Sequence, residues 1–202
     1  MNLFSIRFIV AAILLELKLN GEKIMELNIG QKVAYPNQGV CLVEGIQKKI
    51  IGDNSMNFYS LRILSDNSII FVPTTNTDRL GIRPIICSSQ YKRLLTDLGM
   101  DFEDVSNDWK IRSRQYNEKL QTGDVFEAAD VLKKLTFLSH EKKLSFREQT
   151  LLEKAKFLIV SEISNASLTD EEKISTKIDK LVAAACEKHL ATQPRVVTAA
   201  VH

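Results

Sequence analysis

Five segments in the second half of the chain begin with a helix-start signal and continue with apolar residues at helical spacing. The starts are expected at Ser88, about Trp109, Asp124, Ser145 and Thr169. Each of the last three precedes a glutamate by three residues, which is the spacing of a capped helix start. In every segment the apolar residues form one face that must be covered. The pattern therefore predicts a compact five-helix domain over residues 85–191.

The stretch before these helices has the pattern of short β-strands. Strands are expected over residues 31–35, 40–51, 57–64 and 68–72. Pro36 and Gly39 form a turn after the first strand, and Pro73 ends the last one. Short strands with tight connections predict a small barrel or strongly bent sheet over residues 25–84, with Gly45 at the bulge that bends it. The predicted fold class is therefore α+β.

Trp109 is the single tryptophan of the chain, and it stands where an acidic connector gives way to the second predicted helix. Three cations, Lys110, Arg112 and Arg114, follow within five residues. A flat side chain among cations suits a stacked, negatively charged nucleic acid. The alternative is a buried side chain that fastens the helix to the core, because tryptophan is highly buried on average. The five apolar faces are complete without Trp109, which weakens this alternative.

Two predicted strands are candidates for accepting a strand from a partner, because unpaired backbone groups at a sheet edge form a template. One comprises residues 69–72, and the other runs through residues 48–51. The alternative is that both strands belong to the core of the barrel, with Lys48 and Lys49 in solvent.

The motifs of common enzyme classes are absent from the sequence. It contains no phosphate-binding glycine loop, nucleophile elbow or His-Glu-x-x-His zinc motif. The histidines are isolated, and we assign no metal, cofactor or active site. A formal net charge of +2 excludes a polycationic DNA coat. Any contact with nucleic acid must therefore depend on a few local residues.

The cysteines and the two ends of the chain bear on localisation. Cys41, Cys87 and Cys186 are odd in number and widely spaced, which indicates reduced thiols in a cytoplasmic protein. Residues 1–24 contain an apolar run that is shorter than the roughly 20 residues of a membrane span and lacks a cleavage site. We interpret this segment as an appended helix or a start-site artefact and expect no membrane contact. Residues 192–202 are expected to fray.

Several short motifs, in their order and spacing, resemble the CarD/CdnL family of bacterial transcription regulators. Residues 30–40 match the pattern G-x-x-V-x-Y-P-x-x-G-V. Further matches are Phe71-Val72-Pro73, Gly81-Ile82-Arg83, Trp109 with Arg112 and Arg114, Leu120 to Asp124, Leu144-Ser145 and residues 153–156. The combination covers the chain from about Leu27 to Ala191, and it is far more specific than any single motif.

The resemblance implies a Tudor-like or SH3-like N-terminal module that docks on the β subunit of bacterial RNA polymerase, and a helical domain that contacts promoter DNA. In that family the tryptophan wedges into the minor groove at the upstream edge of the melted promoter. The residues implied for DNA contact are Trp109, Lys110, Arg112, Arg114, Lys154 and Lys156. Those implied for polymerase contact are Lys49, Ile70, Phe71 and Val72. Phe71 and Ile111 stand where relatives carry a cation.

The three cations beside Trp109 would neutralise about three phosphates, which gives a salt dependence with a slope near −3. That is weak for a free protein, but tethering on a partner raises the effective concentration to the mM range. We therefore expect a monomeric regulator without enzymatic activity that stabilises the promoter open complex and reads little sequence. The alternative is an adaptor between proteins, in which Trp109 is buried and DNA plays no part.

Overall fold

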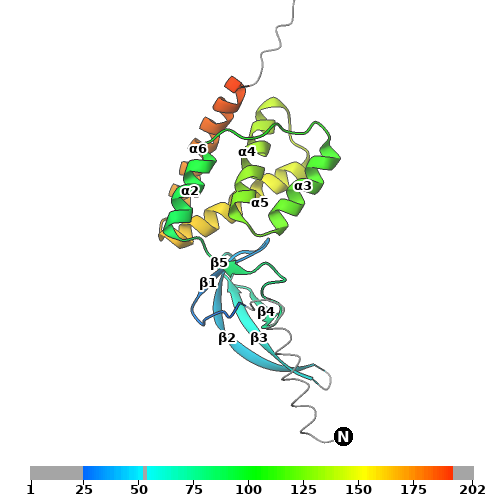
Figure 1. Ribbon diagram of the computed structural model, residues 1–202, viewed down its shortest axis with the longest axis vertical. Coiled ribbons are helices and arrows are strands. Elements are labelled where there is room, and N and C mark those ends of the chain that lie inside the picture. The colour runs from blue at the N-terminus through cyan, green and yellow to red at the C-terminus, as the bar shows by residue number, and fades with distance from the viewer. Residues whose placement is uncertain (1–24, 52–53, 193–202) are drawn as a thin grey trace, which may run out of the picture.

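The computed structural model describes residues 25–51 and 54–192. The predicted N-terminal extension, residues 1–24, lies outside this range, as do residues 193–202 of the predicted tail. Within the described part, a bent β-sheet is followed by a helical bundle that lies at one end of the sheet (Figure 1). No helix in this part has the length and apolar character that a membrane crossing needs.

Within the part of the chain that the structure describes, five antiparallel strands form the sheet in the order β4-β3-β2-β1-β5. The strands are β1 Lys32–Tyr35, β2 Gly39–Ile51, β3 Asn54–Ile63, β4 Ile69–Pro73 and β5 Arg83–Pro84. The first four begin and end within about three residues of the predicted strands, which is the usual uncertainty of strand boundaries. The fifth was not predicted, because two residues ending in proline carry no periodic signal.

The sheet bends where β2 carries an extra residue. The pairing of β2 with β3 shifts register between Val43 and Gly45, which confirms the bulge predicted at Gly45. The buried side chains on one face of the sheet include Val33, Cys41, Val43, Leu61 and Val72, which form a small core. Beyond the bulge, β2 and β3 continue as a hairpin that extends away from the helices (Figure 1).

In the described residues, the helical part has a central helix surrounded by four others. The helices are α2 Ser88–Leu98, α3 Trp109–Gln121, α4 Val125–Glu141, α5 Phe146–Ser167 and α6 Glu171–Thr192. α4 contacts each of the other helices, and its Ala129, Val131 and Leu135 are completely buried. The predicted fold class, an α+β chain with a Tudor-like β module followed by a compact five-helix domain, is confirmed.

The start of α6 differs by one residue from the predicted cap. The sequence pattern paired Thr169 with Glu172, but α6 begins at Glu171. A carboxylate oxygen of Asp170 accepts hydrogen bonds from the backbone N–H groups of Glu172 and Lys173, at 3.0 and 3.4 Å. Asp170 is therefore the cap, since aspartate is an equally good N-cap residue and lies one position later.

Arg83 connects the β module to the helical part. Its two terminal guanidinium nitrogens donate to the two carboxylate oxygens of Glu162 on α5, at 2.5 and 2.8 Å. Arg83 also donates to the carbonyl oxygen of Gly123, in the turn between α3 and α4. Glu162 is only 4% exposed and accepts a further hydrogen bond from the backbone of Ile86. One side chain from β5 thus holds two helical segments.

The ring of Pro36, in the turn between β1 and β2, packs between two glycines. Gly81 precedes β5 and Gly123 lies between α3 and α4, and their φ angles are +68° and +74°. A Cβ atom on Gly123 would lie 2.7 Å from Cγ of Pro36, and one on Gly81 would lie 3.0 Å from it. Both the backbone conformation and the lack of space therefore require glycine at these two positions.

The connector between α2 and α3, residues 99–108, is held against α6. The ring of Phe102 stacks on His189 with the ring centroids 4.2 Å apart, and Phe137 meets the same histidine edge-on. Nδ1 of His189 lies 2.8 Å from a carboxylate oxygen of Asp101, and this hydrogen bond lowers the pKa of Asp101. These contacts fix the path of the connector that leads to Trp109.

Candidate nucleic-acid interface

Trp109 stands at the first position of α3. The helix begins there because a carboxylate oxygen of Asp108 accepts hydrogen bonds from the backbone N–H groups of Lys110 and Ile111, at 2.8 and 3.4 Å. The Trp109 side chain is 55% exposed and does not belong to the helical core. The adaptor hypothesis required a buried Trp109 and is wrong on this point. The ring is accessible to a stacking partner.

Lys110 and Arg114 lie on the exposed surface of α3. Nζ of Lys110 is 5.9 Å from the centroid of the Trp109 ring. Nε of Arg114 lies 3.7 Å from a carboxylate oxygen of Glu118, and both side chains are mostly exposed. An exposed pair of this kind contributes less than about 1 kcal/mol. Arg114 therefore remains available to a phosphate.

Arg112 does not lie on the surface, although the family resemblance predicted that it contacts DNA. The residue is 1% exposed. One terminal guanidinium nitrogen donates to a carboxylate oxygen of Glu148 at 2.7 Å, and the other donates to the carbonyl oxygen of Ser106. The prediction for Arg112 is wrong because residue 112 falls on the inner face of α3, in line with the buried Tyr116 one turn later. Arg112 is a structural cation.

Glu148 links this buried cation to the start of α5. Its second carboxylate oxygen accepts hydrogen bonds from the backbone N–H and the hydroxyl of Ser145, and the Ser145 hydroxyl accepts from the backbone of Glu148. This is the capping box that the sequence predicted. Burial by itself would raise the pKa of Glu148, but the hydrogen bonds from Arg112 and Ser145 outweigh it and lower the pKa to about 2. The carboxylate is therefore charged and fully engaged at neutral pH.

A groove of about 660 Å³ lies beside Trp109, between the start of α3 and the segment that leads into α5. Its walls include the aromatic ring of Phe146 and three cations, Lys142, Lys143 and Arg147. All four of these side chains are exposed, and Phe146 is 88% exposed. Among the described residues of the wall, Glu148 alone carries a carboxylate, and Arg112 neutralises it. The groove therefore combines two accessible aromatic rings with an excess of positive charge.

The sequence around Phe146 carries a signal for this groove. Phe146 is the first residue of α5, and at 100° per residue it lies opposite Ala155, which is completely buried. An aromatic residue on the polar face of a helix, flanked by Lys142, Lys143 and Arg147, is a sign of a contact surface. What the sequence could not give is the position of this segment next to Trp109, more than 30 residues earlier in the chain.

Lys154 and Lys156 lie farther along α5, at least two turns from Phe146. Both side chains are half-buried, and neither lines the groove. Nζ of Lys156 lies 2.7 Å from a carboxylate oxygen of Asp179 on α6. The structure thus separates the predicted second basic patch from the surface around Trp109.

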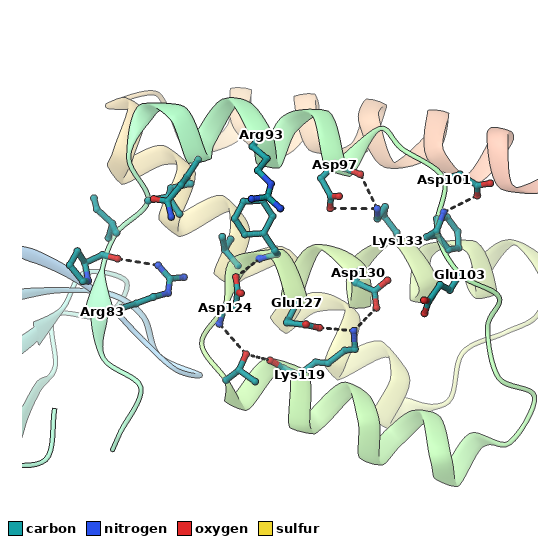
Figure 2. Close-up of a pocket in the computed structure, with 18 residues that line it drawn as sticks. Arg83, Arg93, Asp97, Asp101, Glu103, Lys119, Asp124, Glu127, Asp130 and Lys133 are labelled. Carbon is teal, nitrogen blue, oxygen red and sulfur yellow. Dashed lines mark hydrogen bonds and ion pairs between the residues drawn. The ribbon is translucent and has the colours of Figure 1, made fainter. Parts of the chain in front are cut away.

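A larger hollow of about 900 Å³ lies between α2, the connector and α4, and Figure 2 shows its charged lining. Nζ of Lys119 lies 2.5 Å from Glu127 and 2.9 Å from Asp130. Lys133 lies 3.6 Å from a carboxylate oxygen of Asp97 and also donates to its backbone carbonyl. Because these cations already have carboxylate partners, the hollow is a poorer site for a phosphate than the groove beside Trp109.

Lys49 and Phe71 lie together on the outer face of the sheet. Nζ of Lys49 is 3.2 Å from the centroid of the Phe71 ring and 5.9 Å from that of Phe58. The side chain of Ile70 is half-buried and that of Val72 is fully buried, because both point to the opposite face, towards the core of the β module. Of the four residues assigned to polymerase contact, Lys49 and Phe71 thus form one accessible surface.

β4 lies at one edge of the sheet, and among the described strands it pairs only with β3. Its alternate residues Ile69 and Phe71 are exposed on the outer face. β2 pairs with β1 as far as Leu42 and continues beyond Val43 with β3 alone among the described strands. Both segments that the sequence proposed as templates for a partner strand therefore have one side free of strand pairing within the described residues.

Among the described residues, no group of three or more histidine, cysteine or acidic side chains is arranged to hold a metal ion.

Comparison with known proteins identifies two family domains in the chain. Residues 27–86 match the CarD-like/TRCF RID domain, and residues 93–179 match the CarD C-terminal domain. YdeB of Bacillus subtilis (strain 168), named as a candidate transcription factor, is 26% identical over 148 residues, which cover 73% of this chain and 97% of YdeB. The solution structure of the 72-residue N-terminal domain of Myxococcus xanthus CarD is 34% identical, covers 29% of this chain and 79% of that one, and has a TM-score of 0.26.

The two domain matches follow one another along the chain and coincide with the two hydrophobic cores, one beneath the sheet and one among the helices. The relative in Bacillus is matched over nearly its whole length. The chain belongs to the CarD/CdnL family of transcription regulators.

Proposed function

We propose that this protein docks on the β subunit of bacterial RNA polymerase through the outer face and free edge of β4, and stabilises the promoter open complex by placing Trp109 at the upstream edge of the melted DNA. The observation that carries the proposal is the exposed ring of Trp109 at the wall of a positively charged groove. The match of residues 27–86 to the CarD-like/TRCF RID domain supports the docking half.

The charges around Trp109 suit a contact that depends on tethering. Without Arg112, the exposed cations that the described part of α3 and the groove wall provide are Lys110, Arg114, Lys142, Lys143 and Arg147. Five phosphate contacts would give a salt dependence with a slope of about −4.5, steeper than the value expected from α3 alone. A wedge also needs unstacked bases, which cost a few kcal/mol in closed duplex and less at a bubble edge. The protein therefore favours the open state over the closed one, which shifts the promoter population without chemistry.

Replacing Trp109 by alanine tests the wedge. We expect the lifetime of the promoter open complex to fall about tenfold, because loss of one aromatic stacking contact costs about 1–3 kcal/mol. The affinity for polymerase should not change, since Trp109 is remote from the outer face of the sheet. The lifetime is measured by challenging preformed open complexes with a DNA competitor in the presence of saturating protein.

Leu190→Ala on α6 is the matched control, because Leu190 is also 55% exposed but lies outside the groove. This variant should retain the wild-type lifetime. If Trp109→Ala leaves the lifetime unchanged while the variant remains bound to polymerase, the wedge is refuted.

Lys49 and Phe71 test the docking surface. A double replacement by alanine removes the cation–π pair and its apolar area from the outer face. We expect the Kd for RNA polymerase to rise at least tenfold, as is usual for an aromatic residue central to an interface, where loss exceeds about 2 kcal/mol. A pull-down titration with purified polymerase measures the Kd, and circular dichroism checks that the sheet is intact. Wild-type affinity in the folded double variant would place the docking surface elsewhere.

A further inference from the structure

Phe146 is the most exposed large apolar side chain among the described residues. It does not pack against the helical core, and it does not serve the capping box, in which Ser145 and Glu148 supply the side chains. Neither a structural role nor the wedge attributed to Trp109 accounts for it. Phe146 lines the groove beside the start of α3, together with Trp109.

The groove has the size and the polarity of a site for a nucleotide. Its volume of about 660 Å³ falls within the range of small-molecule sites. Lys142, Lys143 and Arg147 supply three exposed cations. The backbone N–H groups of Phe146 and Arg147 are at the first two positions of α5, where an α-helix has no acceptor of its own for them. Positive charge and the N-terminus of a helix thus lie next to two flat rings.

We propose that this groove binds one unpaired nucleotide of DNA, with the base stacked on the ring of Phe146 and the phosphate held by Lys142, Lys143 and Arg147. The inference rests on the proposed function, which brings the groove to the edge of melted DNA, and it adds a site that distinguishes single-stranded from double-stranded DNA. In a duplex both faces of a base are already stacked, so no base face is available for the ring of Phe146 to stack on. An unpaired base offers a free face of the kind that aromatic side chains bind.

A thermodynamic cycle on the full-length chain tests the site. The probes are a labelled DNA duplex with one unpaired nucleotide at a fork, the same fork with that nucleotide lacking its base, and the fully paired duplex. Wild-type protein should bind the intact fork about tenfold more tightly than the abasic fork. Phe146→Ala should bind both forks equally and should bind the paired duplex as the wild type does. Leu190→Ala, an exposed apolar side chain on α6 that lies outside the groove, is the matched control and should behave as the wild type does.

Each outcome is decisive. Loss of the preference for the intact fork in Phe146→Ala alone supports the site. Equal binding of both forks by the wild type, or an equal effect of Phe146→Ala on all three probes, overturns it; a groove built for an acidic peptide would give the first of these results. A wild type that prolongs open complexes but ignores the unpaired base would leave the wedge standing without the site. A wild-type protein that prefers the intact fork but does not prolong open complexes would support the nucleotide site and refute the wedge.

Discussion

Replacing Arg112 by methionine should lower the free energy of unfolding by about 3–5 kcal/mol, because it leaves the carboxylate of Glu148 buried without its cation. The effect should be measured by urea denaturation at neutral pH. Any loss of DNA binding in this variant would then reflect the displaced start of α5, and not a lost phosphate contact. Arg114→Met on the same helix is the control, since its pair with Glu118 is exposed and should contribute less than about 1 kcal/mol.

A second replacement distinguishes the effect of losing the Arg112 contacts from the effect of leaving a buried charge unpaired. Adding Glu148→Gln to Arg112→Met removes the unpaired carboxylate, so part of the lost stability should return. If Arg112→Met alone unfolds at the wild-type urea concentration, the buried ion pair does not hold α3 to α5.

The same carboxylate makes part of the stability dependent on pH. The pKa of Glu148 lies at about 2 in the folded protein against 4.5 as its ordinary value. A lowered pKa contributes stability that is complete above about pH 4.5 and is lost as the pH falls towards 2. The contribution is about 3 kcal/mol by linkage. Urea denaturation at pH 5 and pH 3 should therefore show a smaller decrease for Glu148→Gln than for the wild type.

Replacing Arg83 by methionine should destabilise the protein by about 3 kcal/mol and loosen the helical part from the sheet. The change leaves Glu162 buried with one backbone donor, from Ile86, and removes both hydrogen bonds to the carbonyl of Gly123. Small-angle scattering should report a broader range of shapes, and limited proteolysis should cleave faster after β5. Open-complex stabilisation should weaken while polymerase binding persists, because the position of Trp109 relative to the DNA is then less well fixed.

Arg62→Met is the matched control for this variant. Arg62 forms a 2.5 Å ion pair with Glu44 on the same sheet, but both side chains are about a third exposed. Its loss should cost less than about 1 kcal/mol and should leave the scattering profile unchanged. An Arg83→Met protein with wild-type stability and wild-type scattering would show that the apolar contacts alone fix the arrangement.

Local signals in the sequence were sufficient for most of the fold. The helix starts at Asp124 and Ser145 follow from capping chemistry that operates within four residues, and the bulge at Gly45 follows from the weakness of glycine in a strand. β5 escaped prediction because its two residues form a strand only by pairing with Val33 and Ala34, about 50 residues away. Pairing over that distance leaves no mark in the local pattern.

The site could be predicted only in part. The exposure of Trp109 agrees with a helix whose apolar face is complete without it. Arg112 was misassigned because charge alone suggests solvent, whereas its inward position depends on Glu148 in another helix. Phe146 was not predicted because its role depends on Trp109, which lies beside it only in the folded protein. The residue types therefore indicated the chemistry of the surface. Which residues belong to that surface depended on contacts between segments far apart in the sequence.

The contacts around Pro36 bear on how the helical part is oriented relative to the sheet. Pro36, Gly81, Arg83 and Gly123 all belong to the short motifs that carry the resemblance to the family, and all four meet where the sheet adjoins the helices. A side chain at residue 81 or 123 would displace the ring of Pro36. The three positions therefore act as a rigid joint. A substitution at any one of them would turn the groove beside Trp109 relative to the outer face of the sheet, although none of the three belongs to either surface.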